Sequence, residues 1–406
     1  MSNAGQVIVA GVGMTRFGKY SDRGMRSLAE EAVHDALGDA AISTKDVEVV
    51  FFSNAAAGLI TGQEMIRGQV ALRKTGLLGI PLFNVENACA SASSAFHLAY
   101  MSIVSGMYDI ALAVGAEKMT SEDKTRAFRA TAAAVDLEEL REIKSRLGSG
   151  EAAAPGAGPS KSLFMDIYAA ATREYMKISG ATAETFADVA VKSHAFAALN
   201  PKAQYRDPVT REQVLNSREI SPPLTLLMCS PIGDGAAAAV LMSEKMARQL
   251  AIQQPVRIRA SVVLSGRDRE PGEPDVLDRA VKRAYEVSGI GPADLDVIEV
   301  HDAAAPAELI ACEELGLCGR GEGPALLASG ATQLGGRHVV NPSGGLLSKG
   351  HPVGATGIAQ IYEIVDQLRG RAGARQANGA RVGLTENGGG FLGRDAAAMS
   401  IHIFSL

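Results

Sequence analysis

Residues 28–55, LAEEAVHDALGDAAISTKDVEVVFFSNA, are similar to residues 277–304, LDRAVKRAYEVSGIGPADLDVIEVHDAA, with Ala29 aligned to Leu277. One offset of 248 positions aligns Ala32 with Ala280 and also aligns the turns and the polar residues that end each copy. Each copy predicts an amphipathic helix, a turn and a short β-branched strand. The chain therefore contains a duplicated helix–strand unit.

The repeat extends beyond these two segments. Both halves continue with a small-residue helix, an apolar strand and an Ala-rich strand, which is typical of α/β architectures. The predicted strands and helices, in chain order, are Val47–Phe52, Ala90–Val104, Ile110–Val114 and Ala236–Leu241 in the first half, and Leu295–Val300, Gly357–Leu368, Arg381–Leu384 and Ala396–Ile403 in the second. Several matched elements in the same order predict an α/β fold built from two equivalent halves.

The first half is interrupted by a long segment at residues 121–222. It is too long for a connecting loop, and it contains the helical patterns Phe164–Lys177 and Ala183–Leu199. We expect an inserted subdomain that lies over the functional site, although a disordered surface excursion would suit Leu147–Ser160. The predicted halves are residues 1–250, which include the insertion, and residues 251–406.

The composition indicates a soluble globular protein. Of 406 residues, 47% are hydrophobic and 21% charged, and the net charge of −5 is accompanied by dispersed basic residues. This argues against a nucleic-acid-binding protein, and no apolar run suggests a membrane span. The N-terminal residues lack the pattern of a signal peptide, so we expect a cytoplasmic protein. The four cysteines lack metal-ligand spacing and are expected to be thiols.

Cys89 lies in NVENACASASSAFHLAY, residues 84–100, after a predicted strand and at the start of a helix. A thiol at a helix N-terminus lies near the positive end of the helix dipole, which is expected to lower its pKa and make it a nucleophile. A buried cysteine packed within a helix would give a similar local pattern.

Two histidines are candidate partners for this thiol. His351 lies in GGLLSKGHPVGATGIAQ, residues 344–360, where glycines and a proline can hold its imidazole rigidly as an adjacent base. His301 follows a predicted strand, the place where α/β folds present active residues. A structural histidine in a loop or at a strand end is the alternative in each case.

A glycine cluster occurs in GLTENGGGFLG, residues 383–393. Consecutive glycines let backbone amides approach a ligand closely, as an oxyanion hole requires, whereas a plain turn would need no such ligand.

Together these motifs resemble the thiolase superfamily over nearly the whole chain, and His301-Asp302-Ala303-Ala304 resembles its sterol-carrier-protein branch and the bacterial and archaeal relatives of that branch. Thiolases of the biosynthetic kind carry Asn-Glu-Ala-Phe at that place. The resemblance implies duplicated βαβαβαββ halves in five layers (αβαβα), an inserted loop domain that contacts coenzyme A, and a homodimer or a dimer of dimers. It also implies coenzyme A thioesters as substrates, with no tightly bound cofactor and no metal.

The resemblance further implies roles for individual residues. Cys89 would form an acyl thioester, and His351 would activate that thiol and help bind the thioester oxygen of the second substrate. His301 would take the place of the Asn-held water in the same oxyanion hole. The amides of Cys89 and of the glycine cluster, at Gly388, would form the other oxyanion hole. Ser230 matches a family serine near pantetheine, although the residues that follow it depart from the family pattern.

The chain departs from the family at the second acid/base. Most thiolases place a further cysteine in the C-terminal Cys-x-Gly motif or, in the sterol-carrier branch, two residues after His-Asp. Here those positions hold Glu386 and Ala303. Glu386 could replace the cysteine as a partly desolvated acid/base, or it could shape the glycine loop; a register slip of one residue would put Asn387 there instead.

Three functions follow as hypotheses. The first is a 3-ketoacyl-CoA thiolase or acetyl-CoA acetyltransferase that works through acyl-Cys89. The second is an acyltransferase, condensing or aldol-cleaving subunit that needs a small OB-fold partner, which the missing cysteine favours. The third is a non-enzymatic binding or scaffold protein. The presence of Cys89, His301 and His351 together argues against it, because a scaffold has no need of all three.

Overall fold

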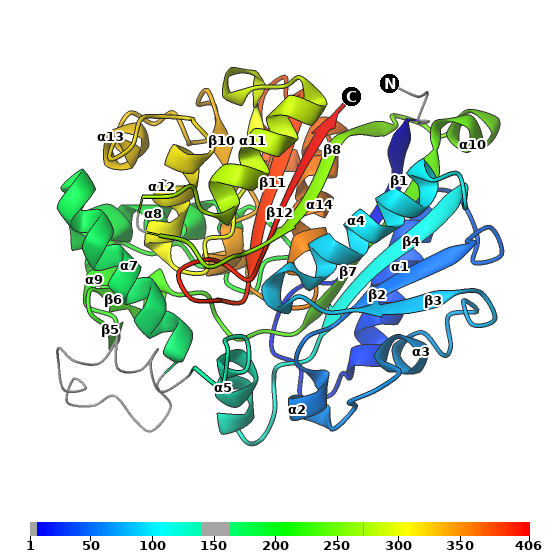
Figure 1. The fold of residues 1–406 in the computed structure, drawn as a ribbon, viewed down its shortest axis with the longest axis horizontal. Helices are drawn as coiled ribbons and strands as arrows, with labels where there is room; N and C mark the ends of the chain where they lie inside the picture. The colour runs from blue at the N-terminus through cyan, green and yellow to red at the C-terminus, as the bar shows by residue number, and fades with distance from the viewer. Residues whose placement is uncertain (1–5, 140–161, 271) are drawn as a thin grey trace.

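A computed structural model describes residues 6–139, 162–270 and 272–406. Outside the insertion, the described N-terminal half forms five strands and four α-helices up to the end of β7 (Figure 1). In chain order these elements are β1 (Val7–Met14), α1 (Met25–Asp39), β2 (Val49–Ser53), α2 (Ala57–Thr61), α3 (Arg67–Ala71), β3 (Leu82–Val85), α4 (Ser91–Val104), β4 (Ile110–Glu117) and β7 (Gly235–Ser243).

The C-terminal half repeats this order, after the short helix α10 (Glu244–Gln249). Its elements are β8 (Val256–Ser265), α11 (Val276–Ser288), β9 (Val297–Glu299), α12 (Ala305–Glu314), α13 (Gly323–Ala328), β10 (Val339–Val340), α14 (Thr356–Leu368), β11 (Val382–Gly389) and β12 (Ala398–Ser405). All the strands and helices predicted from the repeat and the insertion are therefore confirmed, with ends that differ by a few residues.

The described strands of both halves join in one ten-stranded sheet, ordered β10-β9-β11-β12-β8-β1-β7-β4-β2-β3. Read outward from its centre, each half has the same order, and the first strand of one half meets the first strand of the other. Only two residue pairs join them, Ile8 with Arg257 and Val9 with Val256. Within each half the strands before and after the small-residue helix are parallel, and the last strand is antiparallel. Sheet topology thus confirms the duplication.

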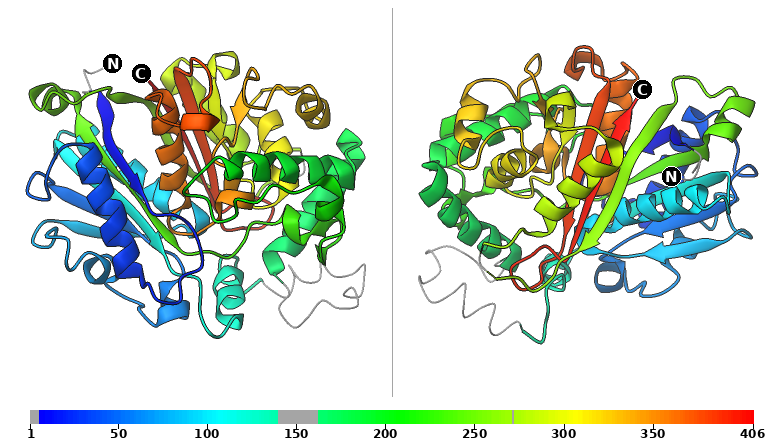
Figure 2. Two further views of the ribbon diagram at one scale, coloured as in Figure 1. Left: turned by 180° about the vertical axis from the view of Figure 1, so that it is seen from behind. Right: turned by 45° about the horizontal axis from the view of Figure 1, so that its top comes forward.

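Helices form three layers around the two half-sheets. Helix α1 covers the outer face of the N-terminal half, α11 and α12 cover the outer face of the C-terminal half, and α4 and α14 lie between the half-sheets. Figure 2 shows α14 in this central position. The predicted αβαβα fold is confirmed.

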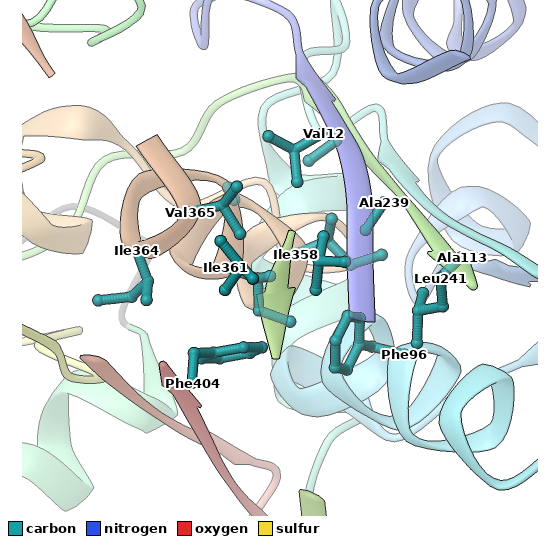
Figure 3. Packing of buried hydrophobic residues seen from close by; sticks show 14 of the residues in the cluster. Val12, Phe96, Ala113, Ala239, Leu241, Ile358, Ile361, Ile364, Val365 and Phe404 are labelled. Carbon is teal, nitrogen blue, oxygen red and sulfur yellow. The ribbon is translucent and has the colours of Figure 1, made fainter. Parts of the chain in front are cut away.

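The middle layer is a core shared by both halves (Figure 3). Phe96 of α4 packs edge-on against Phe404 of β12, with ring centroids 5.9 Å apart, so the first half contacts the last strand of the second. Close packing of α4 and α14 requires Gly357, because a Cβ there would lie 1.9 Å from the Ser93 hydroxyl oxygen. This contact brings the N-terminal ends of both central helices together.

The segment between β4 and β7 forms the insertion, which lies beside α12 in Figure 1. Its described elements are α5 (Thr125–Ala132), α7 (Leu163–Ser179), α8 (Ala183–Ala198), α9 (Arg211–Leu215), β5 (Glu219–Ser221) and β6 (Leu224–Thr225). A buried ion pair between Lys192 of α8 and Glu308 of α12 (2.5 Å) ties the insertion to the C-terminal half. The expected surface excursion at Leu147–Ser160 lies outside the described residues. In the part of the chain that is described, no helix is long and apolar enough to cross a membrane.

Candidate active site

A cavity of about 1350 Å³ lies between the insertion and the two halves. Its walls include Cys89, both candidate histidines, Glu386, the glycine cluster and helices α5, α7 and α12. The sulfur of Cys89 and the nearest ring nitrogens of His301 and His351 lie within 4.8 Å of one another. The structure therefore brings Cys89 together with two histidines that lie more than 200 positions further along the chain. The two histidines come from different segments.

The turn before α4 presents Cys89 to this cavity. Ala88 has a φ of +48°, a left-handed conformation that is unfavourable for a residue with a Cβ. Two hydrogen bonds hold it: the Ala88 amide donates to Glu86 Oε1 (2.6 Å), and the Ser91 hydroxyl donates to the Ala88 carbonyl (2.6 Å). Strained residues that are held in this way are common where a fold presents a reactive group.

His351 contacts the thiol through Nε2, which lies 3.2 Å from Cys89 Sγ. Its Nδ1 lies 2.7 Å from the hydroxyl oxygen of Thr356. That hydroxyl donates its own proton to the Pro352 carbonyl (2.9 Å), so it accepts a hydrogen bond from His351 Nδ1–H. Nε2 of His351 is consequently unprotonated and can accept the thiol proton.

His301 has the opposite arrangement. The Asn387 amide Nδ2 lies 2.8 Å from His301 Nδ1 and donates to it, while the Ser93 hydroxyl donates to Asn387 Oδ1 (2.8 Å). The proton of neutral His301 is then on Nε2, the nitrogen that remains to donate a hydrogen bond. The two imidazole rings stand edge to face, with centroids 5.2 Å apart. One histidine thus offers an acceptor and the other a donor.

Burial determines the charge of the three groups. It raises the pKa of the Cys89 thiol to about 12, and the nearby Glu117 carboxylate adds to the effect. The expectation of a lowered pKa is therefore wrong, because desolvation outweighs the backbone amides at the helix start. Burial also lowers the pKa of His301 to about 4 and holds the pKa of His351 well below its usual range. All three groups are neutral around pH 7.

The glycine cluster lines the cavity beside Cys89 with three consecutive residues, Gly388–Gly390. The backbone amides of Cys89 and Gly390 partly oppose the rise in the pKa of the thiol. Gly388 lines the same cavity but lies within β11, where it pairs with Met399. Gly390 has a φ of +66°, so its backbone favours glycine.

Glu386 is 3% exposed and lines the cavity. Its Oε2 accepts a hydrogen bond from the His301 amide (2.7 Å). Burial raises the pKa of its carboxyl to about 7, and the His301 amide partly opposes that rise. A carboxyl with this pKa can both take up and release a proton near neutral pH. Asn387, the alternative from a register slip, instead faces His301 and Ser93.

Other cavity residues come from the insertion and its borders. Ser230 lines the cavity, and its amide donates to the Ala303 carbonyl (3.0 Å) across the junction with the C-terminal half. Burial raises the pKa of Tyr168, as do the charges of Cys89 and Glu386, so its phenol remains a hydrogen-bond donor. Cationic side chains that line the cavity are Lys19, Lys124 and Arg218.

Sequence reasoning missed several residues that hold the site. Buried Glu117 accepts hydrogen bonds from Ala56 and Gly354 amides (3.2 and 2.9 Å), which ties the loop after His351 to the N-terminal half. Thr356 and Asn387 set the histidine tautomers. A hydroxyl five residues after His351 is a local signal for Thr356, whereas Glu117 carries none because its partners are distant in sequence.

The Cys89–His301–His351 group also contains atoms of the kind that bind zinc. Zinc would need a thiolate and an unprotonated nitrogen from each histidine. The Asn387 contact keeps the proton on the cavity-side nitrogen of His301, so the arrangement suits proton and acyl transfer better than metal binding.

Fold and site thus define a duplicated α/β protein with a cysteine–histidine centre in a large cavity. The model for the thiolase N-terminal domain matches residues 7–221, and the model described as thiolase C-terminal domain-like matches residues 268–402. The chain belongs to the thiolase family and is an acyltransferase.

Individual relatives agree with this assignment. An acetyl-CoA acetyltransferase of Methanothermobacter thermautotrophicus is 40% identical, over 98% of this chain and 99% of the relative. A benzoylsuccinyl-CoA thiolase subunit of Thauera aromatica is 36% identical, over 95% of each chain. Sterol carrier protein 2 of Rattus norvegicus is 36% identical, over 94% of this chain and 69% of the relative.

Two solved structures are similar throughout. One, described as an Ltp2-ChsH2(DUF35) aldolase, has a TM-score of 0.77 and 27% identity, over 98% of this chain and 97% of that one. The other, an acetyl-CoA acetyltransferase from Syntrophomonas wolfei, has a TM-score of 0.68 and 19% identity, over 99% of each chain, and shows the shared fold.

Proposed function

We propose that this enzyme transfers acyl groups between coenzyme A thioesters through acyl-Cys89, and that it forms or cleaves the carbon–carbon bond of a 3-ketoacyl-CoA. The contact between Cys89 Sγ and His351 Nε2 carries this proposal, because Thr356 leaves that nitrogen free to accept a proton. A neutral thiol becomes a strong nucleophile when an adjacent base removes its proton during attack.

In the acylation half-reaction, Cys89 Sγ attacks the thioester carbonyl carbon while its proton passes to His351 Nε2. The amides of Cys89 and Gly388, which both line the cavity, stabilise the negative oxygen of the tetrahedral intermediate. The bond from carbon to the coenzyme A sulfur then breaks, and the leaving thiolate takes the proton back from His351. The product is acyl-Cys89 and free coenzyme A.

In the second half-reaction, Glu386 removes a proton from the α-carbon of another thioester. The Nε2–H of His301 donates a hydrogen bond to the resulting enolate oxygen, which a neutral donor stabilises without an imidazolium. The α-carbon attacks the acyl carbonyl, and Cys89 leaves as the thiolate. The proton that Glu386 took from the α-carbon then passes through solvent to Cys89, which restores the neutral thiol and the Glu386 carboxylate. Cleavage of a 3-ketoacyl-CoA follows the reverse path, with Glu386 returning the proton.

Coenzyme A fits the cavity on the side of the insertion. Lys19, Lys124 and Arg218 supply positive charge for its phosphates, and Ser230 lies where the cavity passes between the insertion and the C-terminal half. Pantetheine would follow this passage toward Cys89.

Intact-mass spectrometry after mixing with acetyl-CoA tests the proposal. We expect a mass increase of one acetyl group on the native enzyme and none on Cys89→Ala, followed by thiolysis of acetoacetyl-CoA by the isolated chain. A native enzyme that forms no adduct with any acyl-CoA would instead support the binding or scaffold hypothesis.

A second candidate function is an aldol-cleaving or condensing subunit that works with a small OB-fold partner. Ala303, where a branch cysteine would stand, favours it, and so does the similarity to a structure described as an aldolase with a DUF35 component. Normal acetylation of Cys89 without thiolysis by the isolated chain, restored by a co-purified small protein, would select this function.

We also propose that two copies associate through β3, the edge strand of the sheet. Its backbone lacks a neighbouring strand on one side in the described chain, and Phe83 on this strand and Met101 on α4 are about half exposed. Light scattering should give a dimer for the native enzyme and a monomer for Phe83→Glu. A monomeric native enzyme would contradict this.

A further inference from the structure

One face of α12 forms a wall of the cavity. Pro306, Ala307, Ile310 and Glu314 line it, and their spacing of three or four residues places them on one side of a helix. Leu277 of α11 and Met399 of β12 line the same region. This region is therefore apolar except for Glu314, at the last residue of α12.

Glu314 is placed where a carboxylate is unfavourable. It is partly buried, the Asp275 carboxyl lies within hydrogen-bonding reach, and Asp278 and Glu386 add further negative charge. The C-terminal end of a helix also repels an anion, because the helix dipole is negative there. No Lys, Arg or His of the described chain forms an ion pair with Glu314 in the structure. Burial and the neighbouring acids raise the pKa of Glu314 well above its usual range, which favours the neutral carboxyl.

Glu386 provides a second polar group in the same cavity. It is 97% buried, and its Oε2 accepts the hydrogen bond from the His301 amide. Its Oε1 has no hydrogen-bond partner among the described residues and does not belong to the fully buried unpaired atoms, in keeping with its place at the cavity wall. The Glu314 charge acts on the same region, so two carboxyl groups with unused hydrogen-bonding capacity face a common space.

We infer that the apolar wall of α12 and the Glu314–Asp275 pair form the acyl subsite, and that it takes an acyl group with an apolar body and a neutral oxygen, as hydroxyl or ketone, at its far end. A protonated carboxyl can donate to a ketone or accept from a hydroxyl. A carboxylate-ended acyl group would add a further negative charge, and an alkyl end would leave Glu314 desolvated and unpaired. This inference rests on the proposed acyl-Cys89 chemistry.

The test compares acylation of Cys89 by pairs of equal length, hexanoyl-CoA with 5-oxohexanoyl-CoA and decanoyl-CoA with 9-oxodecanoyl-CoA. For each, kcat/KM for coenzyme A release is measured, and intact mass confirms the adduct. We expect the native enzyme to prefer the oxo-acyl member of at least one pair by about tenfold, as one hydrogen bond to a buried group predicts. Glu314→Leu should abolish or reverse this preference, and Glu314→Gln should retain it.

Glu286→Leu is the matched control, because it makes the same substitution at an exposed position of α11 that does not line the cavity. It should keep the native preference. Equal use of both members by the native enzyme, or the same preference in Glu314→Leu, overturns the inference while leaving acyl transfer intact. A stronger preference for adipoyl-CoA or 6-aminohexanoyl-CoA also overturns it, in favour of a charged acyl group. Absence of any Cys89 adduct would instead refute the proposed function. Thermal unfolding of both Glu314 variants checks that they fold.

Discussion

Replacing Glu386 with Gln separates the chemistry of acyl transfer from that of the carbon–carbon bond. Acylation of Cys89 uses His351, whereas removal of the α-proton requires the Glu386 carboxylate. General acid–base groups contribute about 10²–10⁴-fold to such steps. We therefore expect Glu386→Gln to lower exchange of the acetyl-CoA α-proton with D₂O by about that factor, while Cys89 is still acetylated.

The pKa of Glu386 determines the direction in which exchange and thiolysis change with pH. The pKa of Glu386 is about 7, so the carboxylate, and with it α-proton exchange, should increase as pH rises through about 7. Thiolysis of acetoacetyl-CoA needs the protonated carboxyl and should fall over the same range. Neither the rise in exchange nor the fall in thiolysis near pH 7 can come from His301 or Cys89, because their pKa values are about 4 and about 12. In the Glu386→Gln variant, neither rate should change with pH around 7.

Stability provides an independent readout. The folded-state pKa of about 7 exceeds the ordinary value of 4.5, so stability from this group is fully present below pH 4.5 and is lost as pH rises through about 7. At 1.36 kcal/mol per pKa unit, the loss is about 3 kcal/mol at pH 9. Glu386→Gln should therefore raise the free energy of unfolding at pH 9 relative to the native enzyme, measured by urea titration.

Glu117→Gln is the matched control. Burial also raises the pKa of Glu117 to about 7, but this residue holds the loop after His351 and does not line the cavity. It should show a similar change in stability with pH yet retain the increase in exchange near pH 7. If α-proton exchange by Glu386→Gln kept its native rate and still increased with pH near 7, Glu386 would not be the acid/base.

Three further predictions concern the residues that support the site. Thr356→Val should slow acylation of Cys89 by about 10²-fold or more, because His351 loses the acceptor that fixes its proton on Nδ1; stopped-flow release of coenzyme A measures this. Asn387→Asp should move the His301 proton to Nδ1, visible in ¹⁵N NMR shifts of the ring, and should lower α-proton exchange. Phe96→Ala should lower the free energy of unfolding by about 3–5 kcal/mol, because it leaves a cavity in the core shared by both halves.

Each of these has an outcome that contradicts it. Unchanged acylation in Thr356→Val would show that the base does not depend on this hydroxyl, with Thr356→Ser as the variant that should restore the native rate. An Nε2–H signal for His301 that persists in Asn387→Asp would remove the role of the amide. A loss below 1 kcal/mol for Phe96→Ala would mean that the halves do not share a core.

The sequence by itself determined the duplicated α/β fold and the three residues that meet in the cavity. Helix and strand periodicity is local, and the repeat places equivalent elements in order without any knowledge of contacts. The residues that mark the GHPVGATG loop and the helix start at Cys89 as reactive are neighbours in the sequence, so each motif can be identified locally. Because such patterns are local, the sequence limits the second acid/base to Glu386 or Asn387 but does not decide between them.

Tertiary structure decided the charges, the tautomers and the shape of the acyl end of the cavity. The pKa of Cys89 rises because layers from both halves desolvate it, an effect that no neighbouring residue in sequence reveals. Asn387 reaches His301 across 86 positions. Glu314 acquires its importance only because folding brings Asp275, Asp278 and Glu386 near it. Desolvation and long-range hydrogen bonds depend on which chain segments pack together, and that is fixed only in the folded molecule.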